Sequence, residues 1–218
     1  DFPDNVQGAV RSRFSQMSVD VQITLKVASV LGRVIDIATL EQVHPDTPDQ
    51  TDLKAYLETA QTAELVRPMP SGAYEFSHAL TQGSVYSLLV ADQRRMLHRS
   101  YAEVLEASDK VQQTASAALL SWHWQEAGEL KTALSYLVQA ADQARETQSH
   151  METAKHLTRA LELNDDLGKP RSDQEIATWY QNLAQALFEM NQVHASITQF
   201  KSAVWLLLRD VRRPSNPA

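Results

Sequence analysis

The sequence predicts a mostly α-helical protein in two parts, with one small β-hairpin in the first part. Apolar residues recur at three- and four-residue spacing along most of the 218 residues, a pattern typical of amphipathic helices. Two short strand-like segments flank Pro70-Ser71-Gly72. Residues 111–208 are rich in Ala, Leu and Gln. Together these observations predict helices throughout, a single hairpin and a change of architecture near residue 109.

The chain up to Ala63 is expected to form a short lead-in helix and three further helices. Ser18 is a good N-cap residue, and Gly32 lies where a C-cap glycine belongs. Ile35 and Ile37 alternate like a brief extended segment before the third helix. The four helices are expected at 6–14, 21–31, 38–43 and 49–63, the last with Leu53, Leu57 and Ala60 on one face.

The β signal lies in residues 65–77. Leu65–Met69 and Ala73–Ser77 are expected as two strands, and Pro68 predicts an edge strand because proline cannot donate to a ladder. A helix is expected at 78–90. A second helix is expected to begin after Asp92, its N-cap, and to reach Ala107. Helix, short helix, helix and hairpin are the order of a winged helix. Residues 1–108 are therefore predicted to form a winged-helix-like domain.

Residues 109–210 are predicted to form an array of helical hairpins. Small residues such as Ala140, Ala154 and Ala186 would let antiparallel helices approach closely, as in tetratricopeptide (TPR) repeats. The insertion at Gly168–Asp173 disturbs a period of about 34 residues, so the array is described as TPR-like. Helices are expected at 113–127, 130–147, 151–163, 174–190 and 194–208, with breaks at Gly128, Ser149, 168–170 and Asn191, and a flexible tail at 211–218.

Composition excludes several classes of chemistry. The absence of cysteine rules out disulfides, thiolate catalysis and Cys-ligated zinc, and it fits a cytoplasmic location. A formal net charge of −7 argues against a nucleic-acid partner. The sequence holds six glycines and no phosphate-binding loop motif, so any nucleotide would be bound by another domain. Its apolar runs are too short to span a bilayer, so we expect no membrane association of this chain. Because the sequence begins with Asp1, we expect a fragment of a longer protein.

Several short phrases follow one another in a characteristic order and spacing. They are Phe2–Gln7, Arg13, Leu25–Arg33, Tyr74–Leu80, Val85–Leu89, Arg94–His98, Ala102–Glu106 and Trp122–Gly128, followed by Ala133, Tyr136 and Ala140-Ala141. In this order they resemble the region behind the ATPase core of STAND-type signalling ATPases. The resemblance covers about residues 1–208 and departs from the pattern at Val34-Ile35-Asp36, where a bulky aromatic is usual.

The resemblance implies a winged-helix and TPR-like regulatory region. Such regions occur behind class III nucleotide cyclase domains, in protein-kinase fusions and in large LuxR-type regulators. It implies an upstream ATPase domain as partner in cis, with ADP or ATP bound there and no cofactor in this chain. It also implies that this chain is not itself an enzyme, although its parent protein would be an ATPase and could carry a cyclase or kinase domain.

His78 is the candidate nucleotide-sensing residue. Within Phe76-Ser77-His78-Ala79-Leu80 it matches the position likened to a sensor histidine that contacts the ADP β-phosphate. A helix start would also favour an anion there. The competing interpretation is a structural histidine whose ring tethers the hairpin to the next helix.

Four basic residues on one expected helix form a candidate partner-contact patch: Arg94, Arg95, His98 and Arg99. They could contact an acidic protein surface or a phosphate. The alternative, which we favour, is a solvated helix face.

Other candidates for chemistry have simpler explanations. Trp122, His123 and Trp124 are expected in the core, since aromatic residues at helix packing positions usually pack there. His150 and His156 are six residues apart and do not share a helix face, so no metal site is expected. Asp165-Asp166 is expected in a loop that ends a helix. No catalytic residue is predicted.

Three functional hypotheses follow. The first is a regulatory scaffold that controls an upstream ATPase domain, with a protein or peptide bound to the TPR-like surface. The second is a DNA-binding winged helix with a helical oligomerisation tail, which needs a basic face on helix 49–63 or on the hairpin. The third is a hydrolase, which needs His78 or His123 to meet a carboxylate and a hydroxyl in one cleft.

Overall fold

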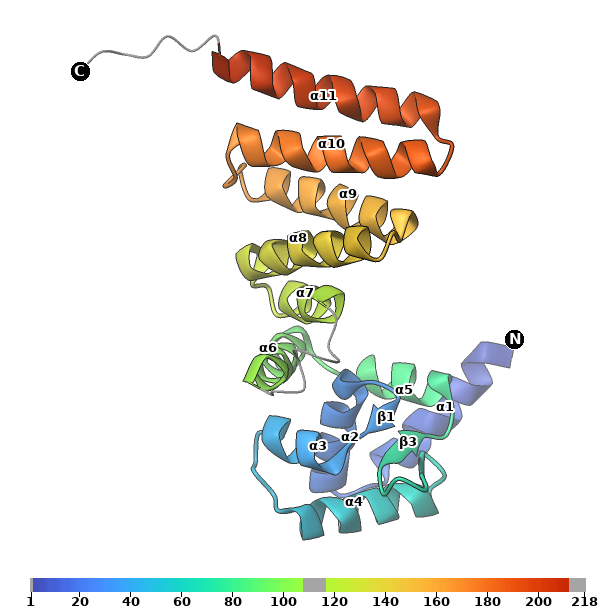
Figure 1. Cartoon of the computed structure of the whole chain (residues 1–218). Helices are drawn as coiled ribbons and strands as arrows, with labels where there is room; N and C mark the ends of the chain where they lie inside the picture. Colours follow the sequence, from blue (N-terminus) through green and yellow to red (C-terminus); the bar gives the residue numbers. More distant parts are fainter. Residues whose placement is uncertain (1, 108–116, 212–218) are drawn as a thin grey trace, which may run out of the picture. The chain divides into compact units, whose positions relative to one another are not determined.

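The computed structural model describes residues 2–107 and 117–211, with side chains from Gln7 to Arg209 within those ranges. The chain forms two compact units, Asp1–Asp109 and Lys110–Ala218. Both are mostly helical, and a small antiparallel sheet lies in the first (Figure 1). The predicted boundary at 108/109 and the predicted tail, from Arg212 onward, lie outside the described residues.

The first unit contains six helices and three strands in its described part. Asp49 caps α4 by accepting from the N–H groups of Thr51 and Asp52, and Ser18 caps α2 as predicted. Each capping side chain satisfies N–H groups that lack an intrahelical acceptor. The elements are α1 (Phe2–Ser15), α2 (Val19–Leu31), β1 (Val34–Ile35), α3 (Ile37–Val43), α4 (Gln50–Thr62), β2 (Val66–Pro68), β3 (Tyr74–Phe76), α5 (Ala79–Tyr86) and α6 (Ala91–Ala107).

The predicted hairpin is present as β2 and β3, and a third strand joins it. The order in the sheet is β1-β3-β2, with both pairings antiparallel. Pro68 therefore lies on an edge strand, as predicted. Glu75 on the central strand pairs with Arg33 at 3.3 Å and with Arg67 at 2.6 Å. These two ion pairs link β3 to the segments on either side of it.

The expected helices around residues 78–107 begin and end elsewhere. Helix α5 ends at Tyr86 rather than Val90, because Leu88 and Leu89 donate to carbonyls three residues back, Val85 and Tyr86. Those tighter turns bring Leu89 into the core at 5% exposure. Helix α6 begins at Ala91, so Asp92 lies in its first turn and is not its N-cap.

The core of the first unit consists of apolar side chains from its helices and its sheet. Leu53, Leu57 and Ala60 of α4 are fully buried, which confirms the predicted face. They join Leu25 of α2 and Phe76 of β3 in one cluster of buried side chains. Fully burying side chains of this size stabilises the folded state by about 1.5–3 kcal/mol each.

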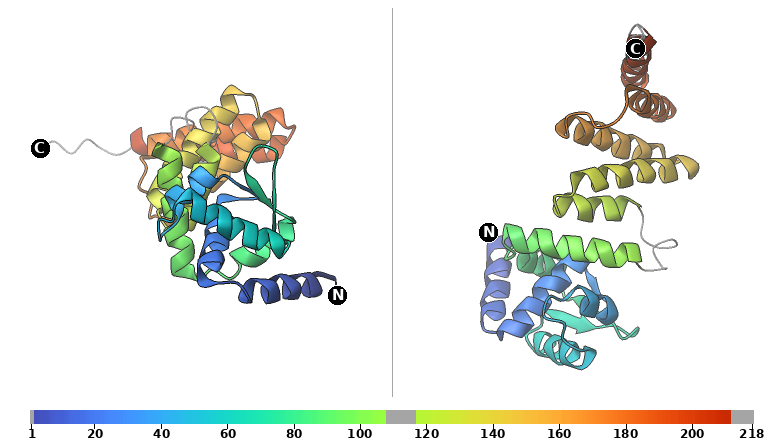
Figure 2. Two further views of the ribbon diagram at one scale, coloured as in Figure 1. Left: turned by 90° about the horizontal axis from the view of Figure 1, so that it is seen from below. Right: turned by 90° about the vertical axis from the view of Figure 1, so that its left-hand side faces the viewer.

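The second unit is a succession of helices, each packed on its neighbours in sequence (Figures 1 and 2). Ala133, Ala140, Ala154 and Ala160 are buried between them, which keeps neighbouring helices close. The described helices are α7 (Ala117–Glu126), α8 (Leu130–Glu146), α9 (His150–Asp166), α10 (Asp173–Glu189) and α11 (Val193–Val211). The predicted breaks are all present, although Asp165-Asp166 lies in the last turn of α9 rather than in a loop.

Four consecutive helices of this unit end in the same backbone motif. After α8, Gln148 N–H donates to Arg145 O at 3.0 Å and Ser149 N–H donates to Ala144 O at 2.8 Å. This Schellman pattern places a residue with positive φ just beyond each helix. That residue is Gly128, Gln148, Gly168 and Asn191 after α7, α8, α9 and α10 respectively.

None of the helices in the described part of the chain combines the length and apolar character needed to cross a membrane.

Candidate interaction sites

His78 lies exposed at the start of α5, directly after the hairpin. The backbone holds it there, since Ser77 N–H donates to Leu65 O at 3.0 Å and Thr81 N–H donates to His78 O at 2.9 Å. Its ring does not cap the helix and makes no hydrogen bond or ion pair with any residue that the structure describes. Among the described residues, no side-chain hydrogen bond or ion pair of His78 therefore supports its interpretation as a tether.

The surface around His78 combines polar and apolar groups. Ala79 is also exposed, and Leu80 is 53% exposed. As in any helix, the first N–H groups of α5 lack intrahelical acceptors. The start of α5 therefore presents an imidazole, backbone donors and an apolar side chain side by side.

The predicted basic patch on α6 is not one surface. His98 is fully buried, so the prediction that it contacts a partner is wrong. Arg95 pairs with Asp92 on the same helix. Arg94 places its guanidinium over the ring of Tyr86, at 4.7 Å from the ring centre. Arg95 and Arg99 are both exposed, so only part of the predicted patch lies at the surface.

His98 is held as a neutral core residue. Its Nε2 lies 2.9 Å from the Tyr86 hydroxyl, and the two rings meet edge to face. Burial, with a smaller contribution from the Arg94 charge, lowers the pKa of His98 from its ordinary 6.5 to about 4. His98 lies four residues before the buried Ala102, a helical spacing that places both on the inner face and that the basic neighbours obscured.

The aromatic phrase at residues 122–124 is only partly core. His123 and Trp124 are buried, as predicted, whereas Trp122 is 44% exposed and meets His123 edge to face. Burial keeps His123 away from solvent.

The two histidines of α9 lie in different surroundings. His156 is buried, with its Nε2 3.4 Å from a Glu152 oxygen, and burial lowers its pKa despite that carboxylate. His150, the first residue of α9, is half-buried. The residues that the structure describes contain no group of three His, Asp or Glu side chains that could hold a metal ion.

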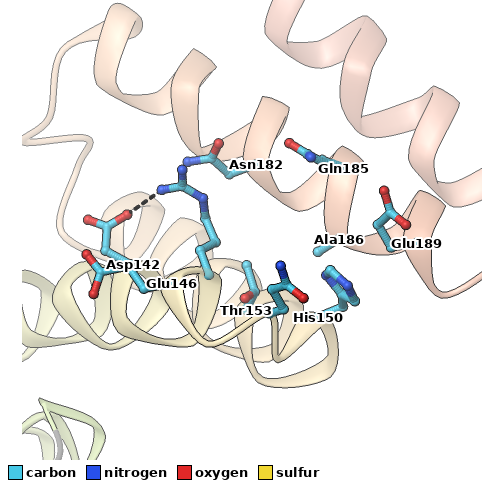
Figure 3. Close-up of a pocket in the computed structure, with 10 residues that line it drawn as sticks. Asp142, Glu146, His150, Thr153, Asn182, Gln185, Ala186 and Glu189 are labelled. Atoms are coloured by element: carbon cyan, nitrogen blue, oxygen red, sulfur yellow. Dashed lines mark hydrogen bonds and ion pairs between the residues drawn. The ribbon is translucent and has the colours of Figure 1, made fainter.

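A polar hollow lies where α8, α9 and α10 meet (Figure 3). Asn182, Gln185 and Glu189 of α10 face His150 and Thr153 of α9 across it. The α8 side contributes Asp142, Arg145 and Glu146, and the turn contributes Gln148. Amide, carboxylate and imidazole groups thus converge from three helices.

The electrostatics of this polar hollow favour a positively charged guest. The carboxylates of Asp142, Glu146 and Glu189 outnumber the one guanidinium, that of Arg145. Arg145 already donates to Asp142 at 2.8 Å, which neutralises one carboxylate. The remaining negative charge and the neutral amides can bind Lys or Arg side chains and a peptide backbone.

The polar hollow is not among the features that the sequence predicts. The signal was present on α10, where Asn182, Gln185, Ala186 and Glu189 follow helical spacing. The lining residues of α8 and α9 could not be predicted in the same way, because only the packing of the helices brings them opposite α10.

A comparison with known proteins finds distant similarity to a longer protein. An uncharacterized protein of Rhizobium meliloti (strain 1021) is 23% identical to this chain over 159 residues. The match covers 72% of this chain and 15% of the relative, so the chain spans a small part of the relative's length. No family model and no solved structure matches the chain.

Proposed function

We propose that this chain is a non-catalytic regulatory and protein-interaction module of a larger signalling ATPase. The first unit would act as a winged-helix-like domain next to the nucleotide-binding domain. The second would act as a TPR-like array that receives a partner. The observation that carries the proposal is the polar hollow, to which three successive helices contribute side chains.

The first unit supports this proposal through its order of elements. Helices α2, α3 and α4 precede the β2–β3 hairpin, and β1 completes a three-stranded sheet. That order is typical of winged helices, many of which bind proteins rather than DNA. The exposed start of α5, with His78 and Leu80, offers a contact surface for a neighbouring domain.

The charges of the first unit favour a protein partner over DNA. Helix α4, which would be the groove-reading helix, exposes Asp52 and Glu58 with a single cation, Lys54. Arg67 on the hairpin pairs with Glu75, so its charge is already compensated. Carboxylates facing a phosphate backbone would oppose binding.

The second unit supports the proposal through its repetition. Four helices end in the same Schellman motif, and each packs on the next, as in repeat arrays that bind peptides along one face. The polar hollow would take a segment with a basic side chain, which the carboxylates of Glu146 and Glu189 would hold. Asn182 and Gln185 would bond to its backbone.

Nucleotide-dependent association tests the first unit's role. The upstream nucleotide-binding region of the parent protein would be titrated with this chain in the presence of ADP, ATP or neither. We expect ADP-favoured binding that weakens in His78→Ala and persists in the control His194→Ala, an exposed histidine of the second unit. Association indifferent to nucleotide and to His78 would refute the sensing role. Salt-sensitive binding to duplex DNA without association would refute the regulatory proposal.

A peptide array tests the second unit's role. We expect the chain to select peptides containing Lys or Arg, and Asn182→Ala to weaken the binding of those peptides, because it removes a bond to the peptide backbone. Gln174→Ala on the same helix is the control, because Gln174 is exposed and lies outside the polar hollow. Selection of peptides without basic residues, or equal effects of the two variants, would contradict the assignment.

A further inference from the structure

A groove in the first unit lies between α4 and the turn that joins α1 to α2, and we call it the α4 groove (Figure 1). Its apolar surface comes from Met17, Val21, Ala55, Tyr56 and Ala63. All of its walls lie within residues 13–64, inside the described part of the first unit.

The α4 groove exists because α4 directs small side chains towards α1. Ala55, Thr59 and Ala63 recur every four residues, so they lie along one side of the helix. Met17 and Tyr56 are partly buried and pack against the core of the unit. The apolar surface of the groove therefore continues the core outward, and a partner that covers it removes apolar area from water.

Arg13 closes one end of the α4 groove. Its Nη1 donates to Ala63 O and to a Glu64 carboxylate oxygen, both at 3.2 Å. The guanidinium and the carboxylate compensate each other, so this end carries little net charge. The same bonds link the end of α1 to the end of α4.

The other end of the α4 groove is acidic. Burial raises the pKa of Tyr56, and the charges of Asp20, Asp52 and Asp49 raise it further, so these three carboxylates lie near the ring. None of them forms an ion pair with a residue that the structure describes. Asp49 caps α4, whereas Asp20 and Asp52 are exposed and available to a partner.

The cations of the same helices do not compensate this acidic end. Arg11 lies two residues before Arg13, and Lys54 lies two residues before Tyr56. Two residues correspond to about 200° of rotation, so Arg11 and Lys54 lie on the far sides of their helices. Lys26 of α2 lies more than one turn beyond Val21.

The remaining charged and titratable groups nearby leave the sign unchanged. Burial lowers the pKa of His44, whose ring Asp20 and Asp46 influence, so His44 is uncharged at neutral pH. Asp46 adds a further carboxylate, and Glu58 shares the far side of α4 with Lys54. A complementary partner must therefore bring cations.

We infer that the α4 groove binds a short amphipathic α-helix of a partner protein whose apolar stripe ends in Lys or Arg. From Asp52 to Ala63, α4 extends for about 17 Å, the length of about three helical turns. Apolar side chains of the partner pack on Met17 and Tyr56, as in helix-in-groove recognition, and its cations pair with Asp20 and Asp52.

This site is separate from the polar hollow, which lies in the second unit, and it does not depend on the function proposed above. Nucleic acids and anionic lipid surfaces fit it less well than a protein. Their phosphates would meet the carboxylates of the acidic end and be repelled.

Designed helical peptides test the inference on the full chain. The probe has about three helical turns, a Leu stripe with Lys at both ends, and a side-chain lactam that holds it helical. Two matched peptides carry Glu in place of every Lys, or Ser in place of every Leu. By calorimetry we expect the Leu–Lys peptide to bind at least about tenfold more tightly than either, because it alone supplies both the apolar contact and the ion pairs.

Variants locate the bound peptide. Thr59→Arg places a long cationic side chain in the groove and should weaken binding at least about tenfold. Gln61→Arg is its control, because Gln61 is exposed on α4 outside the groove. Asp52→Asn should weaken binding about threefold by removing one exposed ion pair, whereas Glu58→Gln should not. Circular dichroism checks that each variant is folded.

Several outcomes would overturn the inference. Equal binding of the Leu–Lys and Leu–Glu peptides would show non-specific apolar contact, and equal binding of the Ser peptide would show charge attraction alone. Equal effects of Thr59→Arg and Gln61→Arg, or loss of binding in Asn182→Ala, would place the peptide elsewhere. Absence of binding by all three peptides would leave no helix site. A dimer in sedimentation that Thr59→Arg dissociates would make a second copy the occupant.

Discussion

The hydroxyl of Tyr86, the last residue of α5, lies 2.9 Å from Nε2 of His98, the only histidine among the described residues of α6. This bond joins two helices across the four-residue interval, residues 87–90, over which the first helix had been expected to continue. It also holds a titratable ring in the core, although the side chains of the basic patch had been expected at the surface.

The buried His98 predicts acid destabilisation of the first unit. The unfolded chain binds a proton near the ordinary pKa of 6.5, whereas the folded state accepts it only near pH 4. Stability is therefore complete above pH 6.5 and falls as the pH drops, by up to about 3 kcal/mol near pH 4. Urea unfolding of the full chain, followed by NMR of first-unit methyl groups such as those of Leu57, measures this.

His98→Gln should flatten that pH dependence, whatever its effect on stability at neutral pH. His78→Gln, at an exposed position, should retain it. Some dependence should persist in both, because burial also lowers the pKa of His44. An unchanged slope in His98→Gln would contradict the assignment.

The turn after α8 predicts a stabilising substitution. Gln148 has a φ of 56°, a conformation that side chains other than Asn and Asp adopt at a cost, whereas Gly168 holds the same place after α9. Gln148→Gly should stabilise the second unit by up to about 1 kcal/mol. Tryptophan fluorescence during urea unfolding reports on this unit, since all four tryptophans lie in it.

Gly168→Ala is the matched control for that turn. An added Cβ would meet no atom within 4 Å, so backbone strain alone should cost about 1 kcal/mol. If Gln148→Gly destabilised the unit instead, the Gln148 side chain would have a role in the polar hollow that outweighs its strain.

The start of α10 predicts a loss of stability on removing one hydroxyl. Ser172 Oγ accepts from Glu175 N–H at 3.2 Å, and a Glu175 carboxylate oxygen accepts from Ser172 N–H at 3.0 Å. Ser172→Ala breaks this capping box and should cost about 1 kcal/mol. Ser202→Ala, in the interior of α11, should change stability by less, because its hydroxyl only bonds to a carbonyl of its own helix.

The same capping box has a pH signature. Hydrogen bonds from the Ser172 backbone and hydroxyl hold the pKa of Glu175 below its ordinary value. The stabilisation is therefore present at neutral pH and is lost as the pH falls through that lowered pKa. Equal stability losses for Ser172→Ala at neutral and acid pH would contradict this role.

Local features of the fold were predictable because their causes are local. Ser18 and Gly32 bound α2 by bonding to backbone groups within the same few residues. Pro68 could be placed on an edge strand because it has no N–H to donate. The Ser172-x-x-Glu175 pattern could have been found the same way.

Contacts between distant segments were harder to foresee. Strand β1 joins the sheet because Val34 and Ile35 pair with Glu75 and Tyr74, about 40 residues further along. Nothing near Val34 specifies that partner. The break between α5 and α6 likewise depends on Leu89 reaching the core, which a run of helix-forming residues does not reveal.

The sequence by itself determined most of the helices, the breaks of the second unit and the hairpin, since periodicity and capping act over a few residues. Tertiary structure decided that His98 is buried, that His78 is exposed and that the polar hollow exists. The physical reason is that exposure and electrostatic surroundings depend on which faces pack together. Asn182 and His150 become neighbours only when α10 covers α9, and the pKa of His98 falls only when the core excludes water from its ring.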